Sequence, residues 1–314
     1  MWTLFTLVSP EPTDKCTQKT SQFINTVGMK ADVHCLPEWM LFDFVMELNK
    51  YRLNEPALHY YGNDITWNDM VKRVDAAAKA YTALGVKEGD VVSFVSAGIP
   101  ETIASVYALN RLGAIANTID PRMDVGSIKR NIVNSGSKIL VAIDIAFPKV
   151  RPIMREINQD MIVVQSASTS LPLFKKIAMK LAVKTDVPYG AKVISWNDFI
   201  SGGKDAEVID SPYVGDGVVA ITYTGGTTGF PKGVMMTNDS MNSVSLNFKY
   251  SAAYFNDSDR FLGIIPIFAA YGMVCGTHMP LCMRTTLVPV PKFVPQEIGK
   301  LVKQFRPNHI ISTP

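Results

Sequence analysis

The residues best suited to chemistry lie in one glycine- and threonine-rich stretch in the second half of the chain. It reads Tyr-Thr-Gly-Gly-Thr-Thr-Gly-Phe-Pro-Lys-Gly-Val from residue 223 to 234. Glycine tolerates positive φ and has no side chain to hold a ligand away, so several backbone N–H groups can converge on one anion. Threonine hydroxyls add donors, and Lys232 adds a positive charge suited to phosphate oxygens. This stretch therefore predicts a loop that binds a polyphosphate.

The residue order differs from that of the Walker phosphate loop. That loop has Gly-Lys followed by Ser or Thr at the start of a helix, whereas here Pro231 precedes Lys232 and Gly233 follows it. Apolar runs at 218–221 and 234–236 indicate strands on both sides. Tyr223, at the end of the first run, is expected to pack beneath the loop as core. A hairpin turn without a ligand is the alternative interpretation of the whole stretch.

Composition argues against several classes of protein. A formal net charge of +3 on 314 residues, with no stripe of Lys or Arg, argues against nucleic-acid binding. Lys175, Lys176 and Lys180 form a modest cluster that we interpret as a solvated face. The four cysteines form no Cys-x-x-Cys pair and no histidines stand at zinc-like spacing. We therefore expect no metal site in this chain, and reduced thiols in a cytoplasmic protein without a signal peptide.

One apolar segment has the length of a membrane span. From Phe261 to Met283 only His278 can carry a charge. Glycine and proline residues interrupt this segment at intervals, and its β-rich start ends at Pro266. We therefore expect a buried strand, a loop and a buried helix in which His278 is a satisfied core residue, and no transmembrane segment.

Outside the loop, the hydrophobic pattern alternates strands with helices. Thr66 and Asp69 resemble a capping box between a hairpin at 57–67 and the helix that ends at Gly85. Further strands are expected at 91–95, 113–117, 138–143 and 161–164, with helices at 36–48, 100–112, 125–134 and 150–158 and one amphipathic helix within 166–190. This rhythm predicts an α/β protein with mostly parallel, doubly wound sheets and helices on both faces.

The expected organisation has three parts. An N-terminal arm occupies 1–35, a first α/β subdomain 36–203, and a second 204–314 that carries the phosphate-binding loop. The second sheet is expected to start at Val218. Its later elements are expected to be helices at 239–250, 271–281 and 295–305 and strands at 261–265, 286–289 and 309–312.

The loop closely resembles the signature loop of the adenylate-forming enzymes, which include acyl-CoA synthetases, firefly luciferase and the adenylation domains of peptide synthetases. Three other segments resemble the family in the same order, namely 84–92, 109–117 and 265–272. The resemblance covers roughly residue 36 to the end. In this family the loop holds the β- and γ-phosphates of ATP while a carboxylate attacks the α-phosphate.

The resemblance implies an ATP-dependent carboxylate–CoA ligase that uses ATP, Mg²⁺ and CoA to form an acyl-AMP and then a thioester. The implied ATP-binding residues are Thr224, Gly225, Gly226, Thr227, Thr228, Gly229 and Lys232. The implied acid pocket is lined by Phe268, Ala269, Tyr271 and Gly272, with Ala269 where the family usually has histidine. The apolar character of 261–283 favours a fatty or other hydrophobic acid.

Several parts that the family requires would follow Pro314. They are the Mg²⁺-binding acidic motif, the ribose-binding aspartate, the hinge and the catalytic lysine. The sequence therefore resembles the N-terminal portion of a longer enzyme, and we expect this portion alone to have little activity. Two alternatives stay open: an adenylation domain that loads a carrier protein, and a non-catalytic nucleotide-binding or interaction module. The sequence does not define the oligomeric state.

Overall fold

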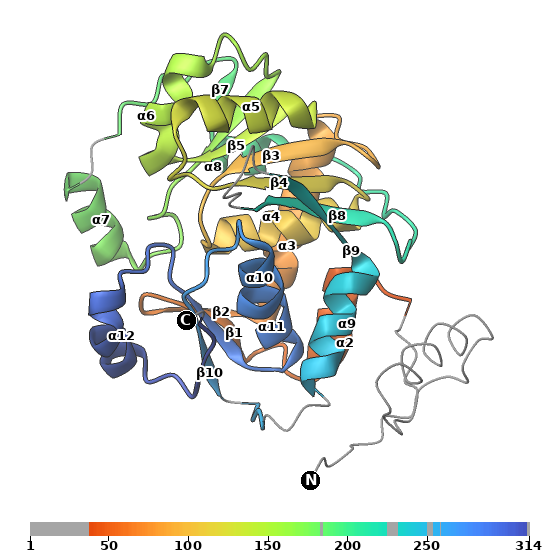
Figure 1. Ribbon diagram of the computed structural model, residues 1–314, viewed down its shortest axis with the longest axis vertical. Helices are drawn as coiled ribbons and strands as arrows, with labels where there is room; N and C mark the ends of the chain where they lie inside the picture. Colours follow the sequence, from red (N-terminus) through yellow and green to blue (C-terminus); the bar gives the residue numbers. More distant parts are fainter. Residues whose placement is uncertain (1–37, 183–184, 225–231, 250–253, 258, 313–314) are drawn as a thin grey trace.

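The computed structural model describes residues 38–182, 185–224, 232–249, 254–257 and 259–312, so the predicted arm at 1–35 lies outside the described residues. The described chain forms two β-sheets with helices packed on and between them (Figure 1). Strand pairs are parallel except in two hairpins. The predicted α/β class with mostly parallel sheets is confirmed.

The larger sheet has the strand order β7-β6-β5-β3-β4-β8-β9. Its strands are β3 (Val91–Val95), β4 (Ile115–Ile119), β5 (Ile139–Ile143), β6 (Met161–Gln165), β7 (Val193–Ser195), β8 (Val218–Tyr223) and β9 (Gly233–Thr237). The helices that follow its strands are α4 (Pro100–Arg111), α5 (Val125–Ser135), α6 (Phe147–Val150), α7 (Leu173–Ala182) and α8 (Trp196–Gly202). The described order matches a doubly wound sheet, because the chain leaves β3 first toward β4 and then crosses to β5.

Helices cover both faces of the larger sheet. Val92 and Phe94 of β3 belong to a core shared with α3 (Trp67–Ala83), α4 and α8, whereas Val95 belongs to a second core built with α5 and α6. The same alternation separates Val141 of β5 from its neighbour Leu140. Strands buried on both faces need apolar side chains at every position, which explains why they read as continuous apolar runs.

The smaller sheet has the strand order β12-β10-β11-β1-β2. Its strands are β1 (Pro56–Tyr60), β2 (Asn63–Thr66), β10 (Arg260–Gly263), β11 (Thr286–Pro289) and β12 (His309–Ile310). The remaining elements are α2 (Leu41–Asn49), α9 (Asn238–Lys249), α10 (Ala270–Met273), the π-helical η3 (Val274–His278), α11 (Met279–Cys282), η4 (Pro295–Glu297) and α12 (Ile298–Phe305). Residues of α2 and α11 join the core of α3 and α4, so the two sheets share one central layer of helices.

Two expectations about the order of elements are wrong. β8 does not start a second sheet, because it pairs with β4 in the larger one, with Ala116 opposite Ala220. Conversely, β1 joins the smaller sheet beside β11. An apolar run indicates a strand but does not specify the strand that pairs with it. Assigning strands to sheets by their order in the sequence therefore gave the wrong partners for β8 and β1. Each sheet contains strands from both sides of residue 203, the expected boundary between the two subdomains. The division of the chain into these subdomains stays a prediction about folding units.

The helix expected at 150–158 is also wrong. The chain instead makes three short turns from residue 144 to 153, namely η1 (Asp144–Ala146), α6 and η2 (Arg151–Ile153). Pro148 and Pro152 lie within the second and third of them. Because proline has no N–H to donate and its ring clashes with the preceding turn, two prolines four residues apart prevent a regular helix.

The apolar segment from 261 to 283 is a strand, a loop and a buried helical stretch, as expected. In the described part of the chain, no helix combines the length and apolar character needed to cross a bilayer. The helical stretch, α10-η3-α11, approaches the preceding loop closely at Gly272, where a Cβ would lie 2.0 Å from the carbonyl oxygen of Pro266. Only glycine fits at this contact without movement of the backbone.

His278 joins three helical elements in the central layer. Its Nδ1 lies 3.2 Å from the hydroxyl of Tyr107 on α4, and its Nε2 lies 3.0 Å from Oδ1 of Asn242 on α9. Complete burial lowers the pKa of His278 to about 3, because a charged imidazole would lose its hydration there. The predicted role of His278 as a satisfied core residue is confirmed.

We expect His278 to make stability depend on pH. Between its unfolded pKa of 6.5 and its folded pKa of about 3, the unfolded chain binds a proton that the folded chain does not. The free energy of unfolding should therefore fall as the pH falls through this window, by up to about 1.4 kcal/mol per pH unit. Urea unfolding between about pH 7 and about pH 5 should show a smaller loss for His278→Gln than for the unmodified protein. Equal losses would contradict the assignment.

The contact at Gly272 provides a second test with a matched control. Gly272→Ala should lower the free energy of unfolding by about 1–3 kcal/mol, because the added methyl group meets backbone atoms that cannot rotate away. Gly276, one turn further along, would place the same methyl group 3.4 Å from its nearest neighbour, the carbonyl oxygen of Ile265. Gly276→Ala should therefore leave stability unchanged or raise it slightly. Similar melting temperatures for the two variants would refute the steric argument.

Candidate active site

The parallel pairing of β4 and β8 places two carboxyl strand ends side by side. Thr118 of β4 lies opposite Thr222 of β8, and the next residues to leave the two strands are Asp120 and Thr224. The carboxyl ends of strands in open α/β sheets are the common location of ligand sites. The predicted phosphate-binding loop therefore starts at the edge of the sheet where this fold places ligands.

The strands on both sides of the loop form a hairpin. Tyr223 of β8 pairs with Gly233 of β9, and the N–H of Thr224 donates to the carbonyl oxygen of Lys232 at 3.1 Å. Thr224 and Lys232 are both exposed, so the two ends of the loop meet at the surface. The predicted strands on either side are confirmed. The intervening predicted ligands lie outside the described residues: Gly225, Gly226, Thr227, Thr228 and Gly229.

Tyr223 anchors the base of this hairpin. Its hydroxyl donates to Oδ1 of Asn117 on β4 at 2.8 Å, and Nδ2 of Asn117 donates to the hydroxyl of Ser93 on β3 at 2.8 Å. The ring is partly buried against the core of α5 and α6, and this burial raises the pKa of Tyr223. The predicted core position of Tyr223 is confirmed, and its hydrogen bonds tie three neighbouring strands together.

Thr118 contacts both β8, the strand that leads into the predicted phosphate-binding loop, and the predicted acid pocket. Its hydroxyl donates to the carbonyl oxygen of Ile221 on β8 at 3.2 Å and reaches the carbonyl oxygen of Phe268 at 3.5 Å. The segment that contains Phe268 therefore lies against the end of β4, next to the strand that leads into the loop. The predicted acid segment therefore lies near β8, the strand that leads into the predicted ATP-binding stretch.

The four predicted pocket residues differ in exposure. Phe268 is only 8% exposed, Gly272 is buried and Ala269 is half-buried, whereas Tyr271 is 41% exposed. Ala269 precedes α10, and its carbonyl oxygen accepts the N–H of Met273 at 2.8 Å. Ala269 stands where the resemblance implies a histidine. The pocket role of these residues stays a prediction.

Sequence reasoning missed a charged pair beside Phe268. The guanidinium of Arg122 lies 5.1 Å from the ring centroid of Phe268, and its Nη2 donates to Oδ2 of Asp120 at 2.7 Å. Hydrogen bonds to Asp120 raise the pKa of Arg122, so this side chain is a permanent cation. The available signal was a pair of charges directly after the apolar strand β4. These two charges indicate a site only in combination with the pairing of β4 and β8, which the sequence does not reveal.

The described residues do not form a Mg²⁺ site. Among them, no three His, Cys, Asp or Glu side chains converge on one point. The aspartates that follow the loop have other partners: Asp239 accepts from the hydroxyl of Tyr213, Asp257 pairs with Arg284 at 2.8 Å, and Asp259 accepts from the backbone of Asn256 and lies 2.8 Å from Nε2 of His309. We therefore assign no chemical step to a metal held by the described part of the chain.

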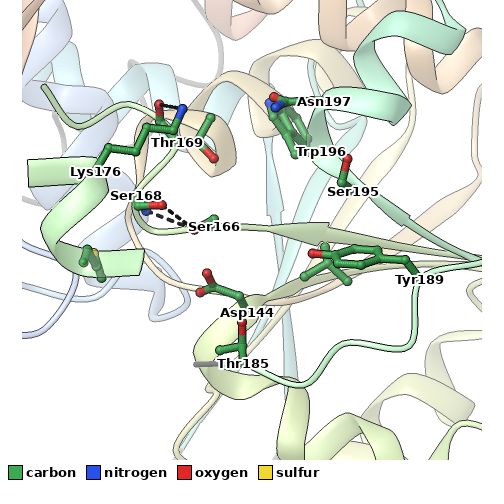
Figure 2. Close-up of a pocket in the computed structure, with 12 residues that line it drawn as sticks. Asp144, Ser166, Ser168, Thr169, Lys176, Thr185, Tyr189, Ser195, Trp196 and Asn197 are labelled. Atoms are coloured by element: carbon green, nitrogen blue, oxygen red, sulfur yellow. Dashed lines mark hydrogen bonds between the residues drawn. The ribbon is translucent and has the colours of Figure 1, made fainter. Parts of the chain in front are cut away.

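A cavity of about 440 Å³ lies elsewhere, at the carboxyl ends of β5, β6 and β7 (Figure 2). Its lining is mostly polar and includes Asp144, Ser166, Lys176, Tyr189 and Ser195. None of the predicted site residues lines it. Because β3 and β4 separate β5 from β8 in the sheet, this cavity is distinct from the site at the hairpin.

Comparison with known sequences identifies relatives that match most of the chain. It is 26% identical over 264 residues to a long-chain-fatty-acid–CoA ligase of Bacillus subtilis, and 28% identical over 256 residues to 4-coumarate–CoA ligase 3 of Oryza sativa. These alignments cover 81% of this chain in both cases, but 47% and 41% of the relatives. The chain therefore spans about half the length of the curated relatives it matches.

Solved structures show the same fold. The anthranilate CoA ligase AuaEII, in complex with anthranoyl-AMP, aligns with 90% of this chain and 51% of its own at a TM-score of 0.75 and 18% identity. A long-chain-fatty-acid–CoA ligase of Archaeoglobus fulgidus aligns with 88% of this chain and 52% of its own at a TM-score of 0.70 and 17% identity. The family model described as AMP-binding enzyme matches residues 45–314. This chain belongs to the AMP-binding enzyme family, whose members among its relatives are acid–CoA ligases.

Proposed function

We propose that this chain is the part of an acid–CoA ligase that binds ATP and the carboxylic acid. In the first step a carboxylate oxygen attacks the α-phosphorus of ATP, the bond to the β-phosphate breaks, and pyrophosphate leaves. In the second step the thiol of CoA attacks the acyl carbon and AMP leaves. The observation that carries the proposal is the Thr118 hydroxyl, which joins β8 of the loop hairpin to Phe268 of the acid segment.

The proposed roles follow from charge and position. Thr224 and Lys232, with the five loop residues between them that were predicted to bind ATP, hold the β- and γ-phosphates. The ammonium of Lys232 offsets negative charge on the leaving pyrophosphate, where a fixed cation stabilises the transition state. Phe268, Ala269, Tyr271 and Gly272 form one wall of the acid pocket. Mg²⁺ would neutralise further phosphate charge, with ligands supplied from outside the described residues.

A fatty or other hydrophobic acid is the proposed substrate class. Ile267 and Phe268, on the proposed wall, are buried apolar side chains. One relative is named for long-chain fatty acids and others for 4-coumarate or acetyl-coenzyme A. Family membership alone therefore leaves the acid open, and the support for this choice comes from the apolar wall. A cytoplasmic location belongs to the same proposal and is supported by Cys275 and Cys282, which are both free thiols.

Carboxylate-dependent exchange of pyrophosphate into ATP tests the proposal. The assay reports the first step alone, so it needs no thiol acceptor, and a panel of acids of increasing chain length defines the substrate class. We expect little exchange by the 314-residue chain alone and robust exchange by any longer form that the gene encodes. Exchange by such a form without transfer to CoA would favour loading of a carrier protein. ATP binding without exchange by any form would favour a non-catalytic module.

Lys232→Met should weaken ATP binding without changing the stability of the unliganded protein. Lys232 is exposed, so its loss costs little in folding, whereas its charge on a phosphate is worth about 1.5–3 kcal/mol. A ligand that binds only the folded state raises the melting temperature, and we expect ATP to lose most of this effect in the variant. Lys204→Met is the control, because Lys204 is exposed and pairs only weakly with Asp205 at 3.9 Å. An unchanged response of Lys232→Met to ATP would contradict the phosphate role.

Thr118→Val should disturb the junction between the two binding regions. Loss of the hydroxyl removes its bonds to Ile221 and Phe268, and we expect about 1 kcal/mol lower stability. In a form active in exchange, the KM for the acid should rise more than the KM for ATP, because Phe268 belongs to the acid wall. The matched control is Thr82→Val, since the Thr82 hydroxyl is buried without a hydrogen-bond partner. This control should be neutral or stabilising, and equal effects of both variants would refute the argument.

A further inference from the structure

One ammonium group binds the turn that connects β4 to α5. The Nζ atom of Lys149 donates to three consecutive carbonyl oxygens, those of Pro121 at 3.0 Å, Arg122 at 2.9 Å and Met123 at 2.8 Å. A lysine ammonium has three N–H donors and no acceptor, so this turn uses its full bonding capacity. Lys149 belongs to α6, within the proline-interrupted turns that follow β5. These bonds therefore fasten the turn after β4 to the segment after β5.

Asp120 fixes the side chain of Arg122 within this turn. Its Oδ1 accepts the backbone N–H of Arg122 at 2.8 Å and Nε at 2.9 Å, and its Oδ2 accepts Nη2 at 2.7 Å. A guanidinium held by both oxygens of one carboxylate has a defined plane and direction. The side chain of Arg122 is 72% exposed, so packing in a core does not orient it. Its direction is therefore set by Asp120 and by the turn that Lys149 holds.

The guanidinium held in this way lies over the ring of Phe268. The distance to the ring centroid is 5.1 Å, which is within the range of attraction between a cation and an aromatic face. Phe268 is also held through its backbone, because the Thr118 hydroxyl reaches its carbonyl oxygen at 3.5 Å. Strand β4 and the turn after it thus contact both the backbone and the ring of this one residue.

Arg122 is poorly suited to bind the carboxylate of a substrate itself. Both oxygens of Asp120 already occupy its guanidinium, and the pair has no net charge. A second carboxylate would have to displace Asp120 or lie beside a like charge, which costs free energy. The contact of the guanidinium with the Phe268 ring needs no such rearrangement, so the geometry favours support of the ring over direct binding of the acid.

We propose that Arg122 is a positioning residue for the acid pocket: Lys149 and Asp120 hold it, and it orients the Phe268 ring that lines the pocket. A ring that is already oriented loses little freedom when a substrate packs against it, so more of the contact energy appears as affinity. Without the guanidinium, one side of the ring loses its support and the bound acid has to restrict it instead. This inference rests on the proposed function, because only that proposal assigns Phe268 to the acid wall.

Kinetics of pyrophosphate exchange test the proposal with the longest chain that the gene encodes. The probe is the most active acid of the chain-length panel. Arg122→Ala should raise the KM for this acid by about two- to fivefold, the value of one cation–aromatic contact, and leave the KM for ATP and the melting temperature unchanged. Lys149→Met should raise the same KM, and the double variant should show no further increase over Arg122→Ala, because Lys149 acts through Arg122. The control Lys129→Met removes a lysine of α5 whose side chain is 38% exposed and pairs with Glu156, and it should change neither KM.

The outcomes separate this inference from the proposed function. Exchange by the unmodified protein together with an unchanged acid KM in Arg122→Ala overturns this inference alone, whereas no exchange with any acid by any form overturns the proposed function and this inference with it. A loss of roughly tenfold to hundredfold in Arg122→Ala, as for a charged hydrogen bond, would assign Arg122 to direct contact with the acid and overturn a positioning role. Additive effects of the two variants would overturn the role of Lys149. Arg122→Ala decides the case even where Lys149→Met folds poorly, since it removes an exposed side chain.

Discussion

The pairing of β4 with β8 determines where the predicted functional regions of this protein lie. Because the two strands are parallel and Thr118 stands opposite Thr222, their carboxyl ends leave the sheet at the same level. One end leads into the hairpin of Thr224 and Lys232, and the other leads to Asp120 and Arg122. A shift of one residue in this register would turn every side chain of β8 to the opposite face. The Thr118 hydroxyl could then no longer reach both Ile221 and Phe268.

Buried polar side chains stabilise this register more specifically than apolar packing could. Asn117, Ser93 and the Tyr223 hydroxyl form a chain of hydrogen bonds across β3, β4 and β8. A buried polar group without a partner costs about 1–3 kcal/mol, so an incorrect pairing would be penalised several times over. Apolar strands, by contrast, tolerate many partners. The polar layer therefore sits immediately below the strand ends, where the position of the loop hairpin has to be accurate.

Local features of the fold were predictable from sequence, and long-range ones were not. The Thr66–Asp69 capping box, strand β3 and strand β11 appear as predicted, because each depends on residues within a few positions of one another. The sheet to which β8 belongs depends on its pairing with β4, about a hundred residues away. A hydrophobic pattern does not indicate which strand is the partner. For the same reason the loop and the acid segment were found by residue type, whereas Asp120 and Arg122 were missed. Their relevance arises only from the neighbourhood of β4 and β8.

Periodicity also fails to say which way an amphipathic helix faces, and α7 shows the consequence. Its pattern predicts a helix, but the pattern is equally compatible with a buried or an outward apolar face; the contacts of Lys175 and Lys176 decide for the outward one. The position of α7 then matters. It connects β6 to β7 at one edge of the larger sheet, whereas the β8–β9 hairpin forms the other edge (Figure 1). With neighbouring strands about 4.8 Å apart, β7 and β8 are separated by roughly 25 Å. Helix α7 therefore lies at the edge of the larger sheet opposite the hairpin that carries the predicted phosphate-binding loop.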